Sequence, residues 1–139
     1  LDKKNRYVGA KIRTGSFTST DIELQSVEMD GSLTQTPEFP YNWMYDGSRP
    51  QMPGFEMEIT CKSLFLIFKD SGEMDVGKAD VFVNDVYCMT ADPHKNNWLH
   101  CNAVLLFWET ESRSHKVRIT VTEEDQNKKF TILGFGYTI

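Results

Sequence analysis

The sequence predicts an all-β protein with about eight or nine short strands. Residues 55–62 alternate apolar and polar side chains, which is the pattern of a strand with one buried and one solvent-facing side. Residues 64–68 are apolar at every position, and so short a run indicates a strand buried on both faces or near the middle of a sheet. Turn-forming residues separate the segments, and none has the period of a long amphipathic helix. This spacing favours an antiparallel β-sandwich or a barrel.

The N-terminal segments carry weaker patterns. Residues 7–12 indicate a first strand, and residues 14–20 have the composition of a loop. Residues 22–29 fit a strand containing a bulge and equally a short helix, because Thr20 and Glu23 have capping-box spacing. We favour the strand because its neighbours are strands.

Residues 30–54 form a long irregular segment. It holds four of the five prolines and four aromatic residues: Phe39, Tyr41, Trp43 and Tyr45. A loop of this length inside a compact domain is usually functional or disordered, and the aromatic content argues against disorder.

The remaining elements follow the two strands of residues 55–68. A polar connection is expected at residues 69–78. We then expect, in order, a strand at 79–83, a turn at 84–85, a strand at 86–89, a loop at 91–98, strands at 103–108 and 116–122, an acidic turn at 123–127 and a last strand at 130–137. The last strand should pair beside the first, and Trp108 is expected in the core.

The totals set the class of protein. A chain of 139 residues fits one β-sandwich domain over residues 1–139. The net charge of −5 argues against a nucleic-acid partner, because binding to phosphates favours basic surfaces. No apolar run approaches the roughly 20 residues of a membrane helix, so no membrane partner is expected. The polar start without Met leads us to expect a domain excised from a larger modular protein.

The three cysteines leave two alternatives. Cys61 lies on the apolar side of its strand, where a thiol behaves as a small hydrophobic group. Either all three are free thiols, or Cys88 and Cys101 form a disulfide across a loop. No C-x-x-C pair is present, so a zinc site is not expected.

Catalytic signatures are missing from the sequence. G-x-S-x-G does not occur, and neither does Gly-Asp-Ser. Asp92-Pro93-His94 is best interpreted as a turn with a surface histidine. The carboxylate pairs Glu109/Glu111 and Glu123/Asp125 stand at strand ends, where acids are ordinarily solvated. We therefore expect no enzyme activity from this domain.

No cofactor is expected either. His94, His100 and His115 lie on different elements, and none has a second ligand at metal spacing. A structural calcium ion remains an alternative, because it requires only oxygen ligands from loops.

Aromatic residues among polar ones give the strongest functional signal. Trp43 and Trp98 both occur in irregular segments. A flat indole ring can cover the apolar C–H face of a sugar, while polar side chains bond the hydroxyl rim. The alternative is that these rings close the ends of the sandwich. The candidate ligand-binding residues are Trp98, Trp43, Tyr41, Tyr45, Asn96, Asn97 and Asp92.

Several segments together resemble a known family. Residues 42–44, 55–68, 79–84, 96–98 and 130–137 resemble the jelly-roll β-sandwich modules attached to SGNH-type carbohydrate esterases, which are similar to the carbohydrate-binding modules of bacteria that degrade plant cell walls. The resemblance implies an antiparallel jelly-roll sandwich, an extracellular or multi-enzyme setting, and sugar binding. It also implies that the Trp43 and Trp98 loops flank the ligand side. The esterase nucleophile block has no counterpart here, so esterase activity is not implied.

The leading hypothesis is a non-catalytic carbohydrate-binding module. It would hold a plant cell-wall polysaccharide by aromatic stacking and so keep a covalently linked catalytic domain near its substrate. The alternative is an accessory domain that packs on the catalytic domain of an SGNH-type esterase and shapes its cleft. A protein-interaction or adhesion sandwich has no support beyond fold class.

Overall fold

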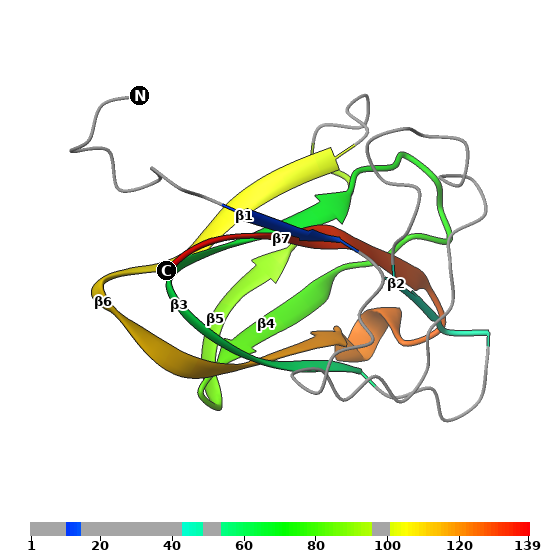
Figure 1. The fold of residues 1–139 in the computed structure, drawn as a ribbon. Helices are drawn as coiled ribbons and strands as arrows, with labels where there is room; N and C mark the ends of the chain where they lie inside the picture. The colour runs from blue at the N-terminus through cyan, green and yellow to red at the C-terminus, as the bar shows by residue number, and fades with distance from the viewer. Residues whose placement is uncertain (1–10, 15–42, 49–53, 96–100) are drawn as a thin grey trace.

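The computed structural model describes residues 11–14, 43–48, 54–95 and 101–139, and within them the protein is almost entirely β (Figure 1). All pairings between the described strands are antiparallel, which confirms the predicted fold class. The elements are β1 (Lys11–Thr14), β2 (Trp43–Asp46), β3 (Phe55–Lys69), β4 (Ala79–Val83), β5 (Val86–Ala91), β6 (Cys101–Val121), the 3-10 helix η2 (Glu123–Asp125) and β7 (Lys129–Thr138).

The described strands form one sheet that bends into two layers. The strand order is β1-β7-β3-β6-β4-β5, with β2 also paired to β7. Strand β3 pairs along its whole length with β6, but only its second half pairs with β7, and only the last part of β6 pairs with β4. Figure 1 shows β3 and β6 curving from one layer to the other at the end of the molecule beside the C-terminus. The expected sandwich is therefore confirmed.

An irregularity in the pairing of β3 with β6 coincides with a reversal of which β3 side chains face the core. Up to Cys61 the odd-numbered residues of this strand are buried, and from Leu64 to Phe68 the even-numbered ones are. The pairing with β6 shifts between Cys61 and Ser63. Lys62 alone stands opposite residues 109–112 of β6, and at such an irregularity the strand can change which of its sides faces inward. The apolar side of β3 therefore stays buried as the strand crosses between layers.

Two pairs of predicted strands are single strands in the structure. Residues 55–62 and 64–68 are both β3, and residues 103–108 and 116–122 are both part of β6. The prediction of separate strands was wrong because a bulge, which has no strong sequence signal, bends a strand without a turn.

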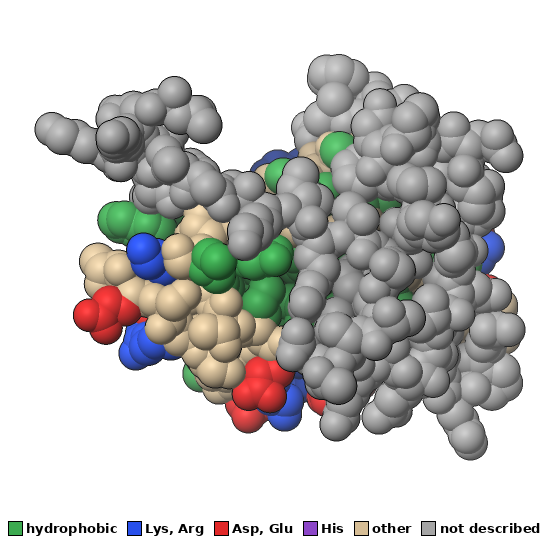
Figure 2. Space-filling model, viewed as in Figure 1, with side chains coloured by type: hydrophobic (Ala, Val, Ile, Leu, Met, Phe, Trp, Pro, Cys, Tyr) green, Lys and Arg blue, Asp and Glu red, His purple; other side chains and the backbone are tan. Residues whose placement is uncertain are grey.

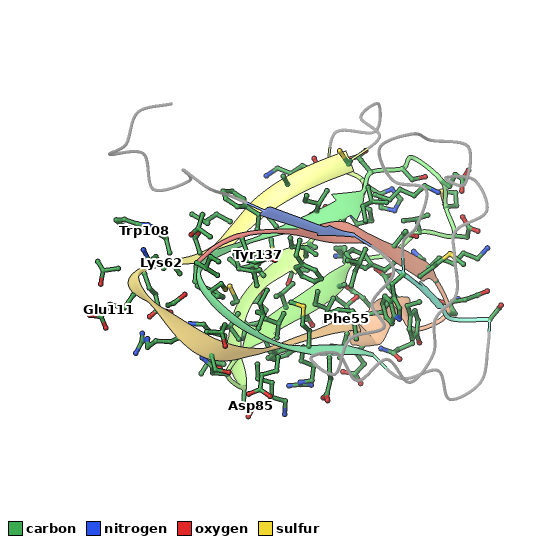
Figure 3. The ribbon with its side chains drawn as sticks, in the orientation of Figure 1. Phe55, Lys62, Asp85, Trp108, Glu111 and Tyr137 are labelled. Atoms are coloured by element: carbon green, nitrogen blue, oxygen red, sulfur yellow. The ribbon has the colours of Figure 1, made fainter. Side chains whose placement is uncertain are left out.

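The β4–β5 hairpin follows the sequence prediction closely. Strand β4 has the expected bounds, and Asn84 and Asp85 have φ angles of 52° and 64°, which a type I′ turn requires. The Asn84 side chain ties the turn to β6, because its Oδ1 accepts a 2.9 Å hydrogen bond from the Lys116 amide. The tip of this hairpin is marked by Asp85 in Figure 3.

The N-terminal predictions are tested only in part. The expected strand at residues 7–12 overlaps β1, which pairs with β7 as expected for first and last strands. The segment at 22–29 lies outside the described residues. Residues 30–54 were expected to be irregular, but Trp43–Asp46 is a strand paired with β7, so this part of the prediction was wrong.

The core lies between the two layers. Phe55 on β3 and Phe135 on β7 stack with their ring centroids 5.5 Å apart, and Figure 3 shows Phe55 among the side chains that fill the interior. Cys61 is buried, and burial raises the pKa of its thiol to about 11. No disulfide joins Cys88 to Cys101, so the alternative with three thiols is confirmed.

Trp108 is not in the core. Its side chain is 49% exposed, and that of Leu105 on the same strand is 39% exposed. A second register shift, at Leu64/Phe65 in β3, leaves one extra residue in β6, and beyond it Trp108 pairs with Ser63. Trp108 lies at the outer edge of the molecule, where hydrophobic atoms reach the surface (Figures 2 and 3).

Candidate functional site

Two of the predicted sugar-binding residues, Trp43 and Tyr45, are core residues. Trp43 is 2% exposed and packs edge-on against Phe55, with ring centroids 5.1 Å apart. Tyr45 is 8% exposed, and its hydroxyl donates a 3.1 Å hydrogen bond to the Gln126 carbonyl. Neither Trp43, predicted to stack on a sugar, nor Tyr45, predicted to contact its edge, presents an open ring face in the described structure. Pairing of β2 with β7 places them over the end of the core, as the alternative interpretation had it.

The other candidates divide into described and undescribed residues. Asp92 is half-buried at the end of β5, and its Oδ1 accepts a 2.9 Å hydrogen bond from the His94 amide. Tyr41, Asn96, Asn97 and Trp98 lie outside the described residues, so their sugar-binding role stays a prediction.

A different set of side chains forms an exposed surface with aromatic and polar members. It lies on the outer side of β4, β5 and the end of β6, and we call it the β4–β5 surface. It consists of Asp80, Phe82, Tyr87, Thr90 and Arg118. The register pairs Phe82 with both Tyr87 and Arg118, and Asp80 with Thr90.

The aromatic half of the β4–β5 surface is a stacked cluster. The rings of Phe82 and Tyr87 meet edge to face with centroids 6.0 Å apart. The guanidinium carbon of Arg118 lies 4.2 Å from the centroid of Phe82, which is a cation–π contact. Tyr87 is 57% exposed, so this cluster presents an aromatic side chain to solvent while its neighbours hold it in place.

The polar half of the β4–β5 surface is a chain of hydrogen bonds. The Tyr87 hydroxyl lies 2.7 Å from Thr90 Oγ1, and Thr90 Oγ1 donates a 2.6 Å hydrogen bond to Asp80 Oδ1. A carboxylate only accepts, so the single hydroxyl proton of Thr90 is committed to Asp80. The Tyr87 hydroxyl must therefore donate to Thr90. We call this chain the hydroxyl relay.

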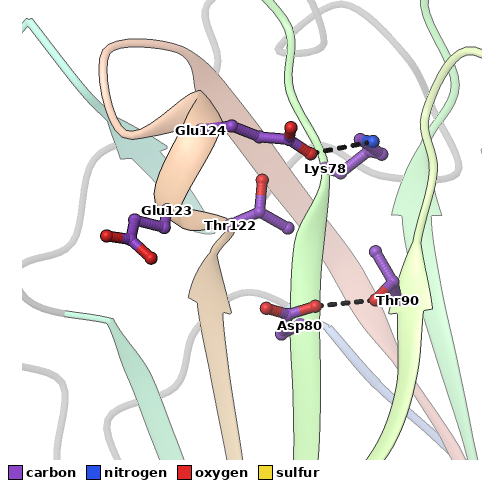
Figure 4. A pocket seen from close by; sticks show the side chains of 6 residues that line it. All are labelled: Lys78, Asp80, Thr90, Thr122, Glu123 and Glu124. Atoms are coloured by element: carbon purple, nitrogen blue, oxygen red, sulfur yellow. Dashed lines mark hydrogen bonds and ion pairs between the residues drawn. The ribbon is translucent and has the colours of Figure 1, made fainter.

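An open depression continues from the relay (Figure 4). It has a volume of about 700 Å³ and shares Asp80 and Thr90 with the β4–β5 surface. Lys78 on its rim pairs with Glu124, with Nζ and Oε1 3.1 Å apart. The pKa of Lys78 is raised, first by its hydrogen bond to Glu124 and, to a lesser degree, by carboxylates that include Asp92. The lining residues are Lys78, Asp80, Thr90, Thr122, Glu123 and Glu124.

The groups considered for catalysis have structural partners. His94 Nε2 donates a 2.5 Å hydrogen bond to the Val76 carbonyl. Glu109 contacts Arg113 and His115. Asp125 accepts a 2.9 Å hydrogen bond from the Lys78 amide, and that bond lowers the pKa of its carboxyl. Each of these groups holds together the segments it contacts.

Within the described ranges, no three His, Cys, Asp or Glu side chains gather as metal ligands would. Among the same residues, no helix has the length and apolar character needed to cross a membrane.

The β4–β5 surface had a sequence signal that was not used. In Ala79–Val83 the side chains of Ala79 and Val81 are buried. Phe82 alternates with them and therefore lies on the same side of the strand as Asp80. An aromatic residue at a solvent-facing position of a strand is a candidate contact. The partner of Asp80, Thr90, and the partner of Phe82, Arg118, come from other strands. Only strand pairing brings these residues together.

No protein-family model and no curated protein sequence matches this chain. Solved structures do. A two-domain esterase active on acetylated mannans, crystallised with mannopentaose, matches with a TM-score of 0.74 and 14% identity over 99% of this chain. The chain shares its fold with part of that esterase. It spans 39% of the esterase chain.

Two further structures have the same fold. An acetyl xylan esterase from the rumen bacterium Butyrivibrio proteoclasticus matches 92% of this chain and 32% of its own, with a TM-score of 0.58 and 15% identity. A family 35 carbohydrate binding module from an environmental isolate matches 90% of both chains, with a TM-score of 0.56 and 14% identity. At these identities the likeness is one of fold, and it confirms the fold resemblance predicted from the sequence.

Proposed function

We propose that this chain is a non-catalytic carbohydrate-binding module whose β4–β5 surface holds a polysaccharide. The observation that carries the proposal is an exposed tyrosine, Tyr87, held beside a row of hydrogen-bonding groups. In this role the domain raises the local concentration of substrate around a covalently linked catalytic domain.

The β4–β5 surface has the two parts that a sugar ring needs. A pyranose presents an apolar C–H face and a rim of hydroxyls, and an aromatic side chain covers the first while polar groups bond the second. Tyr87 and Phe82 supply the aromatic part. The relay oxygens and the Arg118 guanidinium supply acceptors and donors within one row of the sheet. Both parts are on strands, so the surface is rigid before the ligand arrives.

We further propose that the predicted loop residues add to this surface. Asp92, which follows β5, is close enough to Lys78 to help raise the pKa of that side chain, and Lys78 lines the depression. The segment that leads to Asn96, Asn97 and Trp98 therefore starts beside the depression. Within our proposal, Trp98 stacks on a second sugar unit, with Tyr41 as a further edge contact.

The comparisons support the ligand class. Two of the structures with this fold are esterases named for acetylated mannan and acetyl xylan, and a third is a carbohydrate binding module that matches over nearly its whole length. We therefore propose a plant cell-wall polysaccharide as ligand, an esterase as linked enzyme, and an extracellular location.

Affinity electrophoresis of the isolated chain in gels that contain soluble mannan or xylan tests the function. Retarded migration of the wild-type protein is expected, and Tyr87→Ala should weaken binding by about tenfold or more, as loss of an anchoring aromatic does. Met74→Ala is the control, because Met74 is highly exposed and belongs neither to the β4–β5 surface nor to the lining of the depression. Wild-type protein that binds none of the polysaccharides would overturn the proposal.

A second candidate is an accessory domain that packs on a catalytic domain. The exposed pair Trp108 and Leu105 favours it, because exposed apolar side chains at one end of a sandwich suit an interdomain contact. Under this alternative the isolated chain fails to bind polysaccharide, and Trp108→Ser weakens its association with the separately produced catalytic domain.

A further inference from the structure

We propose that the hydroxyl relay makes the β4–β5 surface recognise a free hydroxyl group on a neutral glycan and reject the same position when it is O-acetylated. This inference rests on the proposed carbohydrate-binding function and adds the chemistry that the ligand must present.

The relay has one direction. Asp80 accepts from Thr90, so Thr90 has no second proton to give. The 2.7 Å contact between the hydroxyls of Thr90 and Tyr87 is therefore a bond donated by Tyr87. The carboxylate at one end sets the orientation of both hydroxyls, and hydrogen bonds to a charged acceptor are the strong ones.

The direction decides what the Tyr87 oxygen offers to a ligand. Its proton points back into the relay, so toward solvent it presents lone pairs only. A group that bonds there must donate. A sugar hydroxyl has a proton to donate, whereas an acetyl ester at the same oxygen has none. An unmade hydrogen bond of this kind costs roughly tenfold in affinity.

The charges around the relay select against acidic sugars. Asp80, Glu123 and Glu124 line the depression, and Lys78, which also lines it, is paired with Glu124. With Arg118, which lies over Phe82 on the adjoining surface, three carboxylates face two cations. A uronate carboxylate placed here meets net negative charge. A neutral hexose or pentose unit does not.

Oligosaccharides of equal length test the inference, because acetylation of a polymer would also change its solubility. Mannopentaose and xylopentaose are each used unmodified and O-acetylated, and binding of the isolated chain is measured by calorimetry. We expect the unmodified form of the better ligand to bind about tenfold more tightly than its acetylated form. Polygalacturonate fragments should not displace either the unmodified or the acetylated oligosaccharide.

Two variants assign the preference to the relay. Thr90→Val frees the Tyr87 hydroxyl to turn and donate, so binding remains and the preference falls to about twofold or less. Tyr87→Phe keeps the ring and removes the oxygen, with the same loss of preference. Thr120→Val is the matched control, because Thr120 pairs with Asp80 in register and lies outside the relay. It should keep the full preference.

The outcomes separate this inference from the function it rests on. Wild-type protein that binds both forms equally overturns the inference and leaves carbohydrate binding intact. Thr90→Val that retains the full preference also overturns it. Wild-type protein that binds no glycan overturns the proposed function, and the inference with it.

Discussion

The hydroxyl of Thr90 on β5 donates a 2.6 Å hydrogen bond to the carboxylate of Asp80 on β4, its partner in the strand register. This bond joins the two strands of the hairpin on the side that faces solvent. Asp80→Ala should lower the free energy of unfolding by about 1 kcal/mol, because the Thr90 hydroxyl loses a charged acceptor at a half-buried position. Urea unfolding measures the change. Glu73→Ala, at an exposed site in the β3–β4 connection, should have no effect.

The stacked pair Phe55 and Phe135 joins the two layers, so its loss should be costly. Phe55→Ala should lower the free energy of unfolding by about 3–5 kcal/mol, the range for removing a large core side chain. Phe55→Leu keeps most of the volume, and its cost should be below about 2 kcal/mol, so it provides a folded variant if the alanine protein does not fold. Tyr87→Ala on the exposed surface is the comparison. A loss for Tyr87→Ala as large as that for Phe55→Ala would contradict this view of the core.

The turn between β4 and β5 carries strain at Asp85, whose φ angle is 64°. Asp85→Gly should raise the midpoint of thermal unfolding slightly, because glycine adopts this backbone conformation without the cost that other residues have. Asp85→Val should lower it. The lost ion pair with Lys116 is solvent-exposed and 3.8 Å long, so it contributes little. Equal midpoints for the two variants would argue against a type I′ turn.

His115 should make stability depend on pH. Its Nδ1 accepts from the Asn84 side chain, and burial, assisted by Arg113, lowers its pKa. Glu109 contacts Nε2, the nitrogen that carries the proton in this neutral tautomer. The unfolded state binds a proton below about pH 6.5, whereas the folded state binds it only at lower pH, so stability is full above that pH and falls as the pH drops through it.

Denaturant unfolding between neutral and mildly acidic pH measures this dependence. His115→Gln keeps a polar side chain at the site and should flatten the curve over the same range. Nuclear magnetic resonance titration of the His115 ring checks the pKa directly. A ring that titrates above its ordinary value would reverse the expected sign.

The cysteines provide a chemical test of the core. Because burial raises the pKa of the Cys61 thiol to about 11, this residue should resist alkylation in the folded protein at mildly alkaline pH. All three thiols should react after denaturation without a reductant, as expected for a chain with no disulfide. Mass spectrometry counts the modified sites. Only one reactive thiol in the denatured protein would indicate a disulfide.

Strand periodicity in the sequence was sufficient for the fold class, the β4 strand, the Asn84–Asp85 turn and the burial of Cys61. These features depend on local patterns: alternation sets which side of a strand is apolar, and turn residues set where the chain reverses. The predicted sugar-binding residues were chosen on a weaker basis, namely that aromatic and polar residues occur close together in one segment. That basis does not distinguish a ring that closes the core from one that faces a ligand, and the structure buries both Trp43 and Tyr45.

The sequence by itself determined that this chain forms β-strands, where several of the turns between them lie, and which side of each strand is apolar. The tertiary structure alone decided that β3 and β6 are shared by both layers, because bulges reverse the facing of side chains without a turn. It also decided that Tyr87, Thr90 and Asp80 form a relay. Their side chains meet because the sheet places two strands side by side, and pairing between strands is a property of the folded chain.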